Sequence, residues 1–322
     1  MILVVGGAGY IGSHTNKQLF KRGYDTIVLD NLVYGHREFA KWGKFIEGDL
    51  ADNILLDKIF SENQIDAVMH FAAYAYVGES VINPSKYYNN NVANTLHLLD
   101  AMLKHNVHNI IFSSTCATYG EVINMPIAEE VAQKPVNPYG KSKLMIENIL
   151  YDYNKAYGIN YCILRYFNAA GADPENEIGE LHCPETHLIP LIMDAAIGKR
   201  ECVSIYGGNY STKDGTCIRD YIHVNDLADA HIRALKYIDK EKVSNCFNLG
   251  NGKGYSVKDI IDMTEEVTGL KIKVKLEAPR DGDPAILIGD ASKAKKILGW
   301  QPEFDLKNII QTAWNWHKGI KQ

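Results

Sequence analysis

A tyrosine and a lysine stand four residues apart, at positions 139 and 143, directly behind Pro138. Proline suits the first turn of a helix, and this spacing places both side chains on one helix face. A free tyrosine has a pKa near ~10 and is a poor base at neutral pH. A lysine cation close by favours the phenolate and lowers that pKa. The pair could therefore take a proton from an alcohol, although Tyr-x-x-x-Lys alone is a common pattern.

A glycine-rich segment near the start of the chain indicates which kind of ligand would bind near this tyrosine and lysine. An apolar run, Ile2 to Val5, precedes Gly6, Gly9 and Gly12, and an amphipathic stretch to Arg22 follows. Strand, turn and helix in this order allow a tight turn and close approach of the backbone to a pyrophosphate. The helix N-terminus supplies N–H groups and a partial positive charge to the phosphates. The segment predicts a dinucleotide-binding loop.

An acidic residue follows at the distance that a dinucleotide site requires. A second apolar run, Thr26 to Leu29, ends in Asp30, which stands 18 residues after Gly12. A carboxylate there can accept a hydrogen bond from a ribose 2′-hydroxyl and would repel a 2′-phosphate. The sequence therefore predicts NAD rather than NADP. A glycine-rich turn that binds nothing is the alternative, and the ordered strand, glycines, helix, strand and acid argue against it.

These residues need a scaffold to hold them in place, and the pattern of hydrophobic residues predicts which strands and helices form it. The first half alternates expected strands (2–5, 26–30, 44–47, 65–71, 109–113 and 160–165) with expected helices (10–22, 53–62, 85–105 and 138–157). Such alternation predicts an α/β fold with a Rossmann-type, doubly wound parallel sheet, whose ligands bind at the carboxyl ends of the strands. We expect a NAD-binding Rossmann domain over residues 1–168.

The remaining residues, 169–322, are expected to form a smaller C-terminal α/β substrate lobe. Residues 169–185 are rich in Gly, Pro, Asp and Glu and indicate a loop. Helices are expected at 186–198, 225–238, 256–268, 291–298 and 305–320, with strands near 202–206, 245–248 and 271–276. The boundary is approximate, and segments of the two parts can interleave.

Composition excludes several classes of protein. A net charge of −5 and a pI near 6.1 leave no nucleic-acid footprint, and no apolar run reaches the ~20 residues that span a bilayer. The chain begins directly with its first strand, so we expect no signal peptide. Six scattered cysteines favour a cytoplasmic protein with reduced thiols. The 11 histidines show no metal-ligand spacing, so no metal site is predicted.

Taken together, the motifs resemble the extended short-chain dehydrogenase/reductase superfamily and, within it, the UDP-glucose 4-epimerases. The similarity covers essentially the whole chain. It is carried by Gly6–His14, Asp30–Leu32, His70–Ala73, Val77–Ser80, Tyr87–Val92, Ser113–Gly120, Pro138–Lys143, Arg165–Asn168 and Asp214–His223.

The resemblance implies a reaction and its catalytic residues. Tyr139 would take the proton from the sugar 4-hydroxyl while hydride passes to a tightly held NAD. The 4-keto sugar would rotate within the site, and hydride would return to the opposite face of C4. Thr115 aligns with the serine usual in the family, and a threonine hydroxyl can make the same hydrogen bond to the 4-oxygen. Lys143 would bind the nicotinamide ribose and hold down the pKa of Tyr139.

The resemblance also implies two sets of binding residues. Besides the glycines, Tyr139 and Lys143, the cofactor contacts would be Tyr10, Ile11, Asp30, Asn31, Asp49, Leu50, Phe71, Ala72, Ala73, Asn90 and Tyr166. Ala75 stands where the family often has a lysine, which removes one expected contact. The substrate contacts would be Thr115, Asn168, His187, Leu188, Tyr206, Arg219, Tyr221, Arg280 and Asp283. Arginine forks suit the oxygens of a UDP diphosphate, whereas His187, which opens an apolar helix, could equally be a cap or packing residue.

Related activities on this scaffold require other residues. Dehydratases and decarboxylases of nucleotide sugars place an acid just after the Ser/Thr position, where this chain has Cys116 and Ala117. A steroid or alcohol dehydrogenase would need no diphosphate site. A non-catalytic NAD-binding sensor would need no Tyr139, Lys143 and Thr115 together. The sequence therefore favours a 4-epimerase.

The sugar and the oligomeric state are left more open. UDP-glucose and UDP-galactose are the expected pair, with UDP-xylose/arabinose and UDP-GlcNAc/GalNAc as alternatives. Leu287 aligns with a position whose bulk influences acceptance of an N-acetyl group, and leucine is intermediate in size. Helices 85–105 and 138–157 could pair with those of a second copy, as in the family, so a homodimer is expected.

Overall fold

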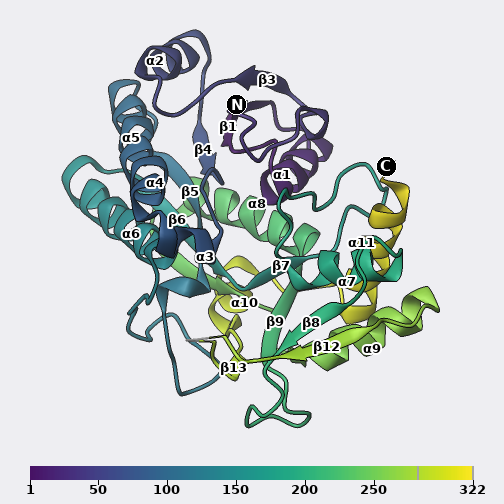
Figure 1. The fold of residues 1–322 in the computed structure, drawn as a ribbon. Coiled ribbons are helices and arrows are strands. Elements are labelled where there is room, and N and C mark those ends of the chain that lie inside the picture. Colours follow the sequence, from purple (N-terminus) through teal and green to yellow (C-terminus); the bar gives the residue numbers. More distant parts are fainter. Residues whose placement is uncertain (281–282, 321–322) are drawn as a thin grey trace.

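The computed structural model describes residues 1–280 and 283–320. A large parallel sheet is covered by helices on both faces, and a smaller lobe lies at the lower right of Figure 1. Among the described residues, every helix is either too short or too polar to cross a lipid bilayer.

Seven strands form the large sheet in the order β10-β6-β5-β4-β1-β2-β3, and every neighbouring pair is parallel. This confirms the Rossmann-type doubly wound sheet. Their bounds are Ile2–Val5 (β1), Thr26–Asp30 (β2), Lys44–Glu47 (β3), Ala67–His70 (β4), Asn109–Thr115 (β5), Asn160–Tyr166 (β6) and Asn245–Leu249 (β10).

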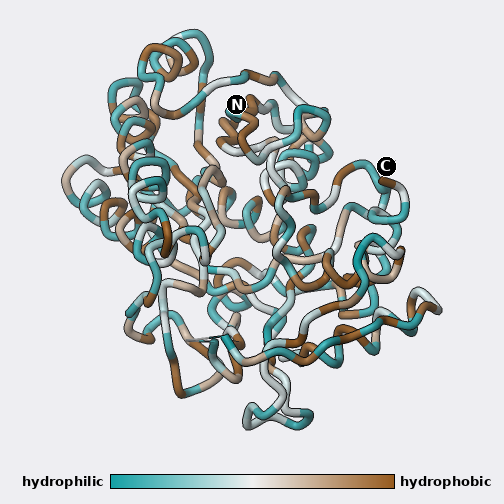
Figure 2. Tube along the Cα trace, in the orientation of Figure 1, coloured by the Kyte–Doolittle hydropathy of each residue, from teal (hydrophilic) through white to brown (hydrophobic). Residues whose placement is uncertain are grey.

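Two hydrophobic cores hold the helices on this sheet. Alternate side chains of β1 enter opposite cores, Ile2 and Val4 on one face and Leu3 and Val5 on the other, which is why the strand is apolar throughout. Figure 2 shows the central strands mainly in brown. The first core holds α1 (Tyr10–Lys21), α8 (Val224–Glu241) and α10 (Ser292–Leu298), and the second α2 (Asn53–Glu62), α5 (Asn94–Lys104) and α6 (Pro138–Tyr157).

Helix α6 begins and ends as its sequence predicts. The Asn137 side chain accepts from the N–H of Gly140 at 2.8 Å, Pro138 occupies the first turn, and Gly158 ends the helix in the left-handed conformation. These signals place Tyr139 in the first turn of the helix and Lys143 one turn later.

The single helix expected over 85–105 is wrong in its interior. The segment contains α4 (Pro84–Tyr87), a π-helical turn (Tyr88–Ala93) and then α5, and it follows a short helix, α3 (Val77–Ile82). Asn91 lies in the π turn, where its amide donates to the carbonyl of Tyr74 and the hydroxyl of Ser142, both at 3.0 Å. These tertiary contacts favour the wider turn, a feature often found at functional sites.

The smaller lobe is built around a third hydrophobic core. Strand β9 pairs with β7, β11 and β13, and β8 pairs with β12. Because β10, α8 and α10 pack on the large sheet, residues after 168 contribute to both parts of the molecule. Its elements are β7 (Asn168–Ala170), α7 (Leu188–Ala196), β8 (Val203–Tyr206), β9 (Ile218–His223), β11 (Gly254–Ser256), α9 (Val257–Thr268), β12 (Val274–Glu277), β13 (Ile286–Leu287) and α11 (Leu306–Gly319).

Candidate functional site

The glycine loop lies at the point where the strand order of the sheet reverses, between β1 and β4. Gly6 has φ +76°, and a Cβ there would lie 2.5 Å from the backbone nitrogen of Ala72, just after β4. A Cβ at Gly12 would lie 2.2 Å from the carbonyl oxygen of Gly6. Both glycines are therefore required by close approach of backbone segments, and the switch point is where such sheets bind ligands.

Gly9 differs from Gly6 and Gly12 because neither its backbone conformation nor the packing around it requires a glycine. Its φ of −80° suits any residue, and a Cβ there would only touch the Gly6 carbonyl, at 3.4 Å. Helix α1 starts at the next residue without a side-chain cap or an acidic residue in its first turn. An uncapped helix start with an open glycine in front of it fits a pyrophosphate, so the residues present suit the predicted dinucleotide.

Asp30 ends β2 beside this loop and is 8% exposed. Its carboxylate accepts from the N–H groups of Ala8 and Leu32, both at 2.9 Å. Burial raises its pKa, while these two N–H groups oppose the rise. The acid is thereby fixed in position next to the turn, as a ribose-binding carboxylate must be.

The other predicted cofactor residues surround the same edge. Asn31 donates to Asp49 at 2.6 Å, and Asn94 donates to the same carboxylate at 3.3 Å. Asn90 lies in the π-helical turn and donates to Asn91 at 3.0 Å. The remaining members of the set follow β4, end β6, start α1 or lie after β3: Phe71, Ala72, Ala73, Tyr166, Tyr10, Ile11 and Leu50.

Thr115 and Tyr139 meet because one glycine lets a helix approach closely. Thr115 is the last residue of β5, and Tyr139 lies in the first turn of α6. A Cβ at Gly140 would lie 2.5 Å from the carbonyl of Ala117, in the turn that follows β5. The Thr115 hydroxyl also accepts from the N–H of Ala117 at 3.1 Å, which fixes its position.

Burial dominates the electrostatics of this pair. It raises the pKa of Tyr139 well above the usual value, and the hydrogen bond with Thr115 only partly opposes it. The expectation that Lys143 lowers the pKa of Tyr139 in the NAD-bound site stays a prediction. The Lys143 ammonium donates to the carbonyl of Ser113 at 2.8 Å, and burial lowers its pKa to about 7.

A buried ion pair beneath this lysine was not predicted. Arg165 of β6 donates to Glu147, one turn beyond Lys143 on α6, at 2.6 Å, and its guanidinium also donates to the Tyr119 hydroxyl at 2.9 Å. The side chains of Arg165 and Glu147 are 7% and 4% exposed. The i, i+4 spacing of Lys143 and Glu147 was the only local signal. The pair fixes α6 against the sheet and so positions Tyr139.

The predicted diphosphate residues also converge. The carboxylate of Asp283 forms ion pairs with both Arg219 and Arg280, the latter at 3.0 Å. The Arg280 guanidinium lies 4.9 Å from the ring centre of Tyr206. An open cleft of about 340 Å³ adjoins them; it is lined by Glu121, Val122, Ile123, Tyr210, Pro279, Arg280, Asp283 and Pro284.

Asn168 and Tyr221 are neighbours in register on β7 and β9. The Asn168 amide donates to the carbonyl of Asp220 at 3.0 Å, and Tyr221 is 7% exposed. Leu287 pairs with Arg219 across β13 and β9. These contacts join the predicted substrate residues of the smaller lobe to the end of the large sheet.

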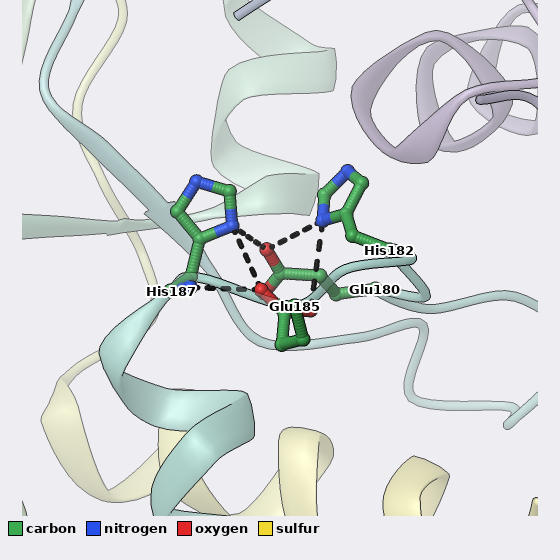
Figure 3. Close-up of side chains that lie close together, drawn as sticks. All are labelled: Glu180, His182, Glu185 and His187. Atoms are coloured by element: carbon green, nitrogen blue, oxygen red, sulfur yellow. Dashed lines mark hydrogen bonds and ion pairs between the residues drawn. The ribbon is translucent and has the colours of Figure 1, made fainter. Parts of the chain in front are cut away.

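His187, predicted to contact substrate next to Leu188, also belongs to a compact group of titratable side chains. Figure 3 shows His182 and His187 each turning Nδ1 toward the carboxylates of Glu180 and Glu185. Burial acts to lower the pKa of each imidazole, but the carboxylates outweigh it and raise the values to about 9 and about 10. This group was not predicted from the sequence, where His182-x-x-Glu185-x-His187 is its only local signal.

Comparison with known proteins agrees with this geometry. The sequence profile of the NAD dependent epimerase/dehydratase family matches residues 2–250. A UDP-glucose 4-epimerase of Halalkalibacterium halodurans is 53% identical over 98% of this chain and 95% of its own.

Solved structures show the same likeness. That of UDP-glucose 4-epimerase from Brucella ovis in complex with NAD superimposes with a TM-score of 0.95, at 50% identity over 98% of each chain. That from Bifidobacterium longum in complex with NAD⁺ and UDP gives 0.94, at 42% identity over 99% of this chain and 98% of the other. The chain therefore belongs to the NAD-dependent epimerase/dehydratase family.

Proposed function

We propose that this protein interconverts UDP-glucose and UDP-galactose by inverting C4 of the sugar, with NAD retained in the site. The observation that carries the proposal is the meeting of Tyr139 and Thr115 at the switch-point edge of the sheet, beside the glycine loop. Arg219 and Arg280 on the smaller lobe supply the cations that a UDP diphosphate needs. The similarity to UDP-glucose 4-epimerases, some solved with NAD and UDP, supports it.

Each residue then has a defined role. Tyr139 acts as a phenolate: it accepts the proton of the 4-hydroxyl and gives it back after the 4-keto sugar has rotated in the site, and a positive charge beside it would oppose the effect of burial on its pKa. The Thr115 hydroxyl hydrogen-bonds the 4-oxygen and keeps it facing the phenol. Bound NAD supplies the hydride acceptor for C4 and a positive charge beside the buried phenol. Lys143 holds the nicotinamide ribose, and Asp30 accepts from the adenosine ribose, which favours NAD over NADP.

The chemistry of Cys116 argues against elimination reactions. A dehydratase needs a proton shuttle at the carbon next to C4, and Cys116 and Ala117 occupy the corresponding turn. Burial raises the pKa of the Cys116 thiol to about 12. It therefore remains protonated near neutral pH and is a poor base.

The test is to incubate the purified protein, without added NAD, with a panel of UDP-sugars and to follow C4 epimers by NMR. The panel includes UDP-glucose, UDP-galactose, UDP-xylose, UDP-arabinose and the N-acetylated hexoses. We expect fastest conversion of the glucose/galactose pair. Preference for a pentose or N-acetylated sugar would replace the assigned substrate, and absence of every epimer would overturn the 4-epimerase assignment.

A matched pair of variants tests the base. Tyr139→Phe should lower the epimerisation rate about 10²–10⁴-fold because it removes the proton acceptor. Tyr151→Phe, on the exposed side of the same helix, should not change the rate. NAD released by denaturation and the melting temperature should match the parent in both variants. A Tyr139→Phe enzyme within tenfold of the parent would show that another group accepts the proton.

We further propose that the protein is cytoplasmic and that it forms a homodimer through α5, the π-helical turn and α6. These elements line an open groove of about 350 Å³ made by Tyr88, Asn89, Val92, Ala93, Leu96 and Met145. Met145 is 44% exposed, as is expected of an apolar side chain that a second subunit covers.

A further inference from the structure

We propose that Glu180, His182, Glu185 and His187 bind a divalent transition-metal ion, of which Zn²⁺ is the suitable probe. One nitrogen or oxygen of each residue lies within 4.8 Å of the others. Two imidazoles with two carboxylates form a ligand set that Zn²⁺ accepts, whereas Mg²⁺ and Ca²⁺ prefer oxygen alone.

The distances suit a tetrahedral ion. The Nδ1 atom of His187 lies 2.8 Å from Glu180 and 3.2 Å from Glu185, and that of His182 lies 3.3 Å and 3.6 Å from the same two carboxylates. Ligand distances of about 2.0–2.2 Å in a tetrahedron separate the ligand atoms by about 3.3–3.6 Å. The four side chains therefore need only small movements to surround an ion.

One atom of the group has only imperfect partners. The Nδ1 of His182 is buried and forms ion pairs with Glu180 at 3.3 Å and Glu185 at 3.6 Å, but no well-aligned hydrogen bond among the residues that the structure describes. A metal ion between the two carboxylates would give this nitrogen a direct ligand bond. In Figure 3 this nitrogen faces into the space between the two carboxylates, where the ion would lie.

The loop that carries these residues is held from outside the group. The carbonyl of Glu180 accepts from the Trp316 indole of α11 at 3.0 Å. One oxygen of Glu185 accepts from the N–H groups of Thr186 and His187 at 2.7 Å and 2.8 Å. Such outer contacts orient metal ligands before the ion arrives. Glu180 and Glu185 have side chains 8% and 13% exposed, whereas His187 at 51% leaves a path of entry.

The charges also match. When an ion displaces the proton from each imidazole, two carboxylates and two neutral imidazoles carry −2, which the divalent ion neutralises in a largely buried place. Because His187 directly precedes α7, a bound ion would fix the start of that helix, including Leu188. The His182 ring lies 6.3 Å from that of Tyr10 at the glycine loop. The ion would thus have a structural role between the two predicted binding regions.

Metal content and binding test the site independently of epimerase activity. The full-length protein is analysed by inductively coupled plasma mass spectrometry as purified, then treated with EDTA and titrated with Zn²⁺ by calorimetry. We expect one ion per chain, and a melting temperature that rises with added Zn²⁺. Replacement by Co²⁺ should give the visible spectrum of a tetrahedral nitrogen and oxygen site.

The variants distinguish this site from other ligands. His182→Ala and Glu180→Gln should each weaken binding about 100-fold or more and abolish the Zn²⁺-dependent rise in melting temperature. His105→Ala is the matched control, because His105 pairs with Asp57 elsewhere on the surface at 2.7 Å. Cys183→Ser tests the exposed thiol next to His182. Both controls should bind like the parent.

Binding that survives both His182→Ala and Glu180→Gln would overturn the site, as would its loss in Cys183→Ser alone. If the parent binds no ion, the proposal is also wrong and the four residues form an ion-pair network only. Circular dichroism of each metal-free variant separates loss of ligands from loss of folding. Because none of these measurements uses a sugar substrate, failure of the epimerase assignment would leave the metal result intact.

Discussion

The hydroxyl of Thr115 provides the sharpest test at the scale of a single residue. If it bonds the sugar 4-oxygen, Thr115→Ser should remain active, whereas Thr115→Val, which has nearly the same shape, should be much slower. A hydrogen bond left unmade in a closed site costs about 1–3 kcal/mol, or about 5- to 150-fold in rate. Steady-state rates at saturating UDP-galactose would measure this.

The valine variant needs its own structural control. The Thr115 hydroxyl also accepts from the Ala117 N–H, so Thr115→Val could loosen the turn. An unchanged melting temperature and NAD content would assign the slower rate to the lost hydroxyl. If Thr115→Val works as fast as the parent, the catalytic hydroxyl must be sought at another residue, such as Ser113 or Ser114.

The buried ammonium of Lys143 should make stability depend on pH in a defined direction. Burial lowers its pKa from 10.5 to about 7, so between these values the unfolded chain holds a proton that the folded chain lacks. This lysine therefore destabilises the fold most below pH 7, and the effect disappears as the pH rises toward 10. The Lys143→Met variant should be more stable than the parent at pH 7, with the difference shrinking by pH 10.

Urea denaturation of cofactor-stripped protein at pH 7, 8.5 and 10 would measure that difference. Lys141→Met, exposed on the same helix, is the control and should show no pH-dependent difference from the parent. A Lys143→Met difference that is constant with pH would mean that the lysine is not discharged by burial.

At the scale of an element, substitutions in the turn between β1 and α1 can test NAD binding and fold stability separately. A Cβ at Gly9 meets nothing closer than 3.4 Å, so Gly9→Ala should fold as stably as the parent without cofactor. Its methyl group would occupy the space where the pyrophosphate approaches, so NAD affinity should fall about tenfold or more. Gly12→Ala should lose both stability and NAD, because its Cβ would lie 2.2 Å from Gly6.

NAD affinity by fluorescence titration and stability by urea denaturation would test this pair. Gly319→Ala, at the end of α11 with no atom within 4 Å of its Cβ, is the neutral control. Normal NAD binding by Gly9→Ala would argue that the pyrophosphate does not pass over this residue.

At the scale of the whole molecule, the groove beside α6 predicts the assembly. If a second copy covers it, the protein should elute and scatter light as a dimer at micromolar concentration. Met145→Glu places a charge in the apolar contact and should weaken dimerisation tenfold or more. Sedimentation velocity over a concentration series would measure the change.

The matched control is Ile297→Glu, a similarly exposed apolar residue on α10, at 40% against 44% for Met145. It should leave the assembly unchanged. A parent that stays monomeric at micromolar concentration, or a Met145→Glu variant that dimerises like the parent, would contradict the predicted interface.

Much of the scaffold follows from the sequence itself. The apolar strand at Ile2–Val5, the glycines, Asp30 and the capped start of α6 each depend on neighbours in the chain, so period and spacing suffice to predict them. The parallel sheet follows from their order. The role of each site residue, and the division at residue 168, remain predictions.

Only the tertiary structure decided how charges are buried and which distant segments meet. Burial by atoms from other parts of the chain lowers the pKa of Lys143 to about 7, which its position in the sequence did not predict. Asp283 meets Arg219 across 64 residues, and Arg165 of β6 meets Glu147 of α6 inside the core. Even the compact loop 180–187 acquired its geometry from contacts such as that with Trp316. Sequence patterns describe local periodicity, whereas desolvation and ion pairing depend on the atoms that folding brings together.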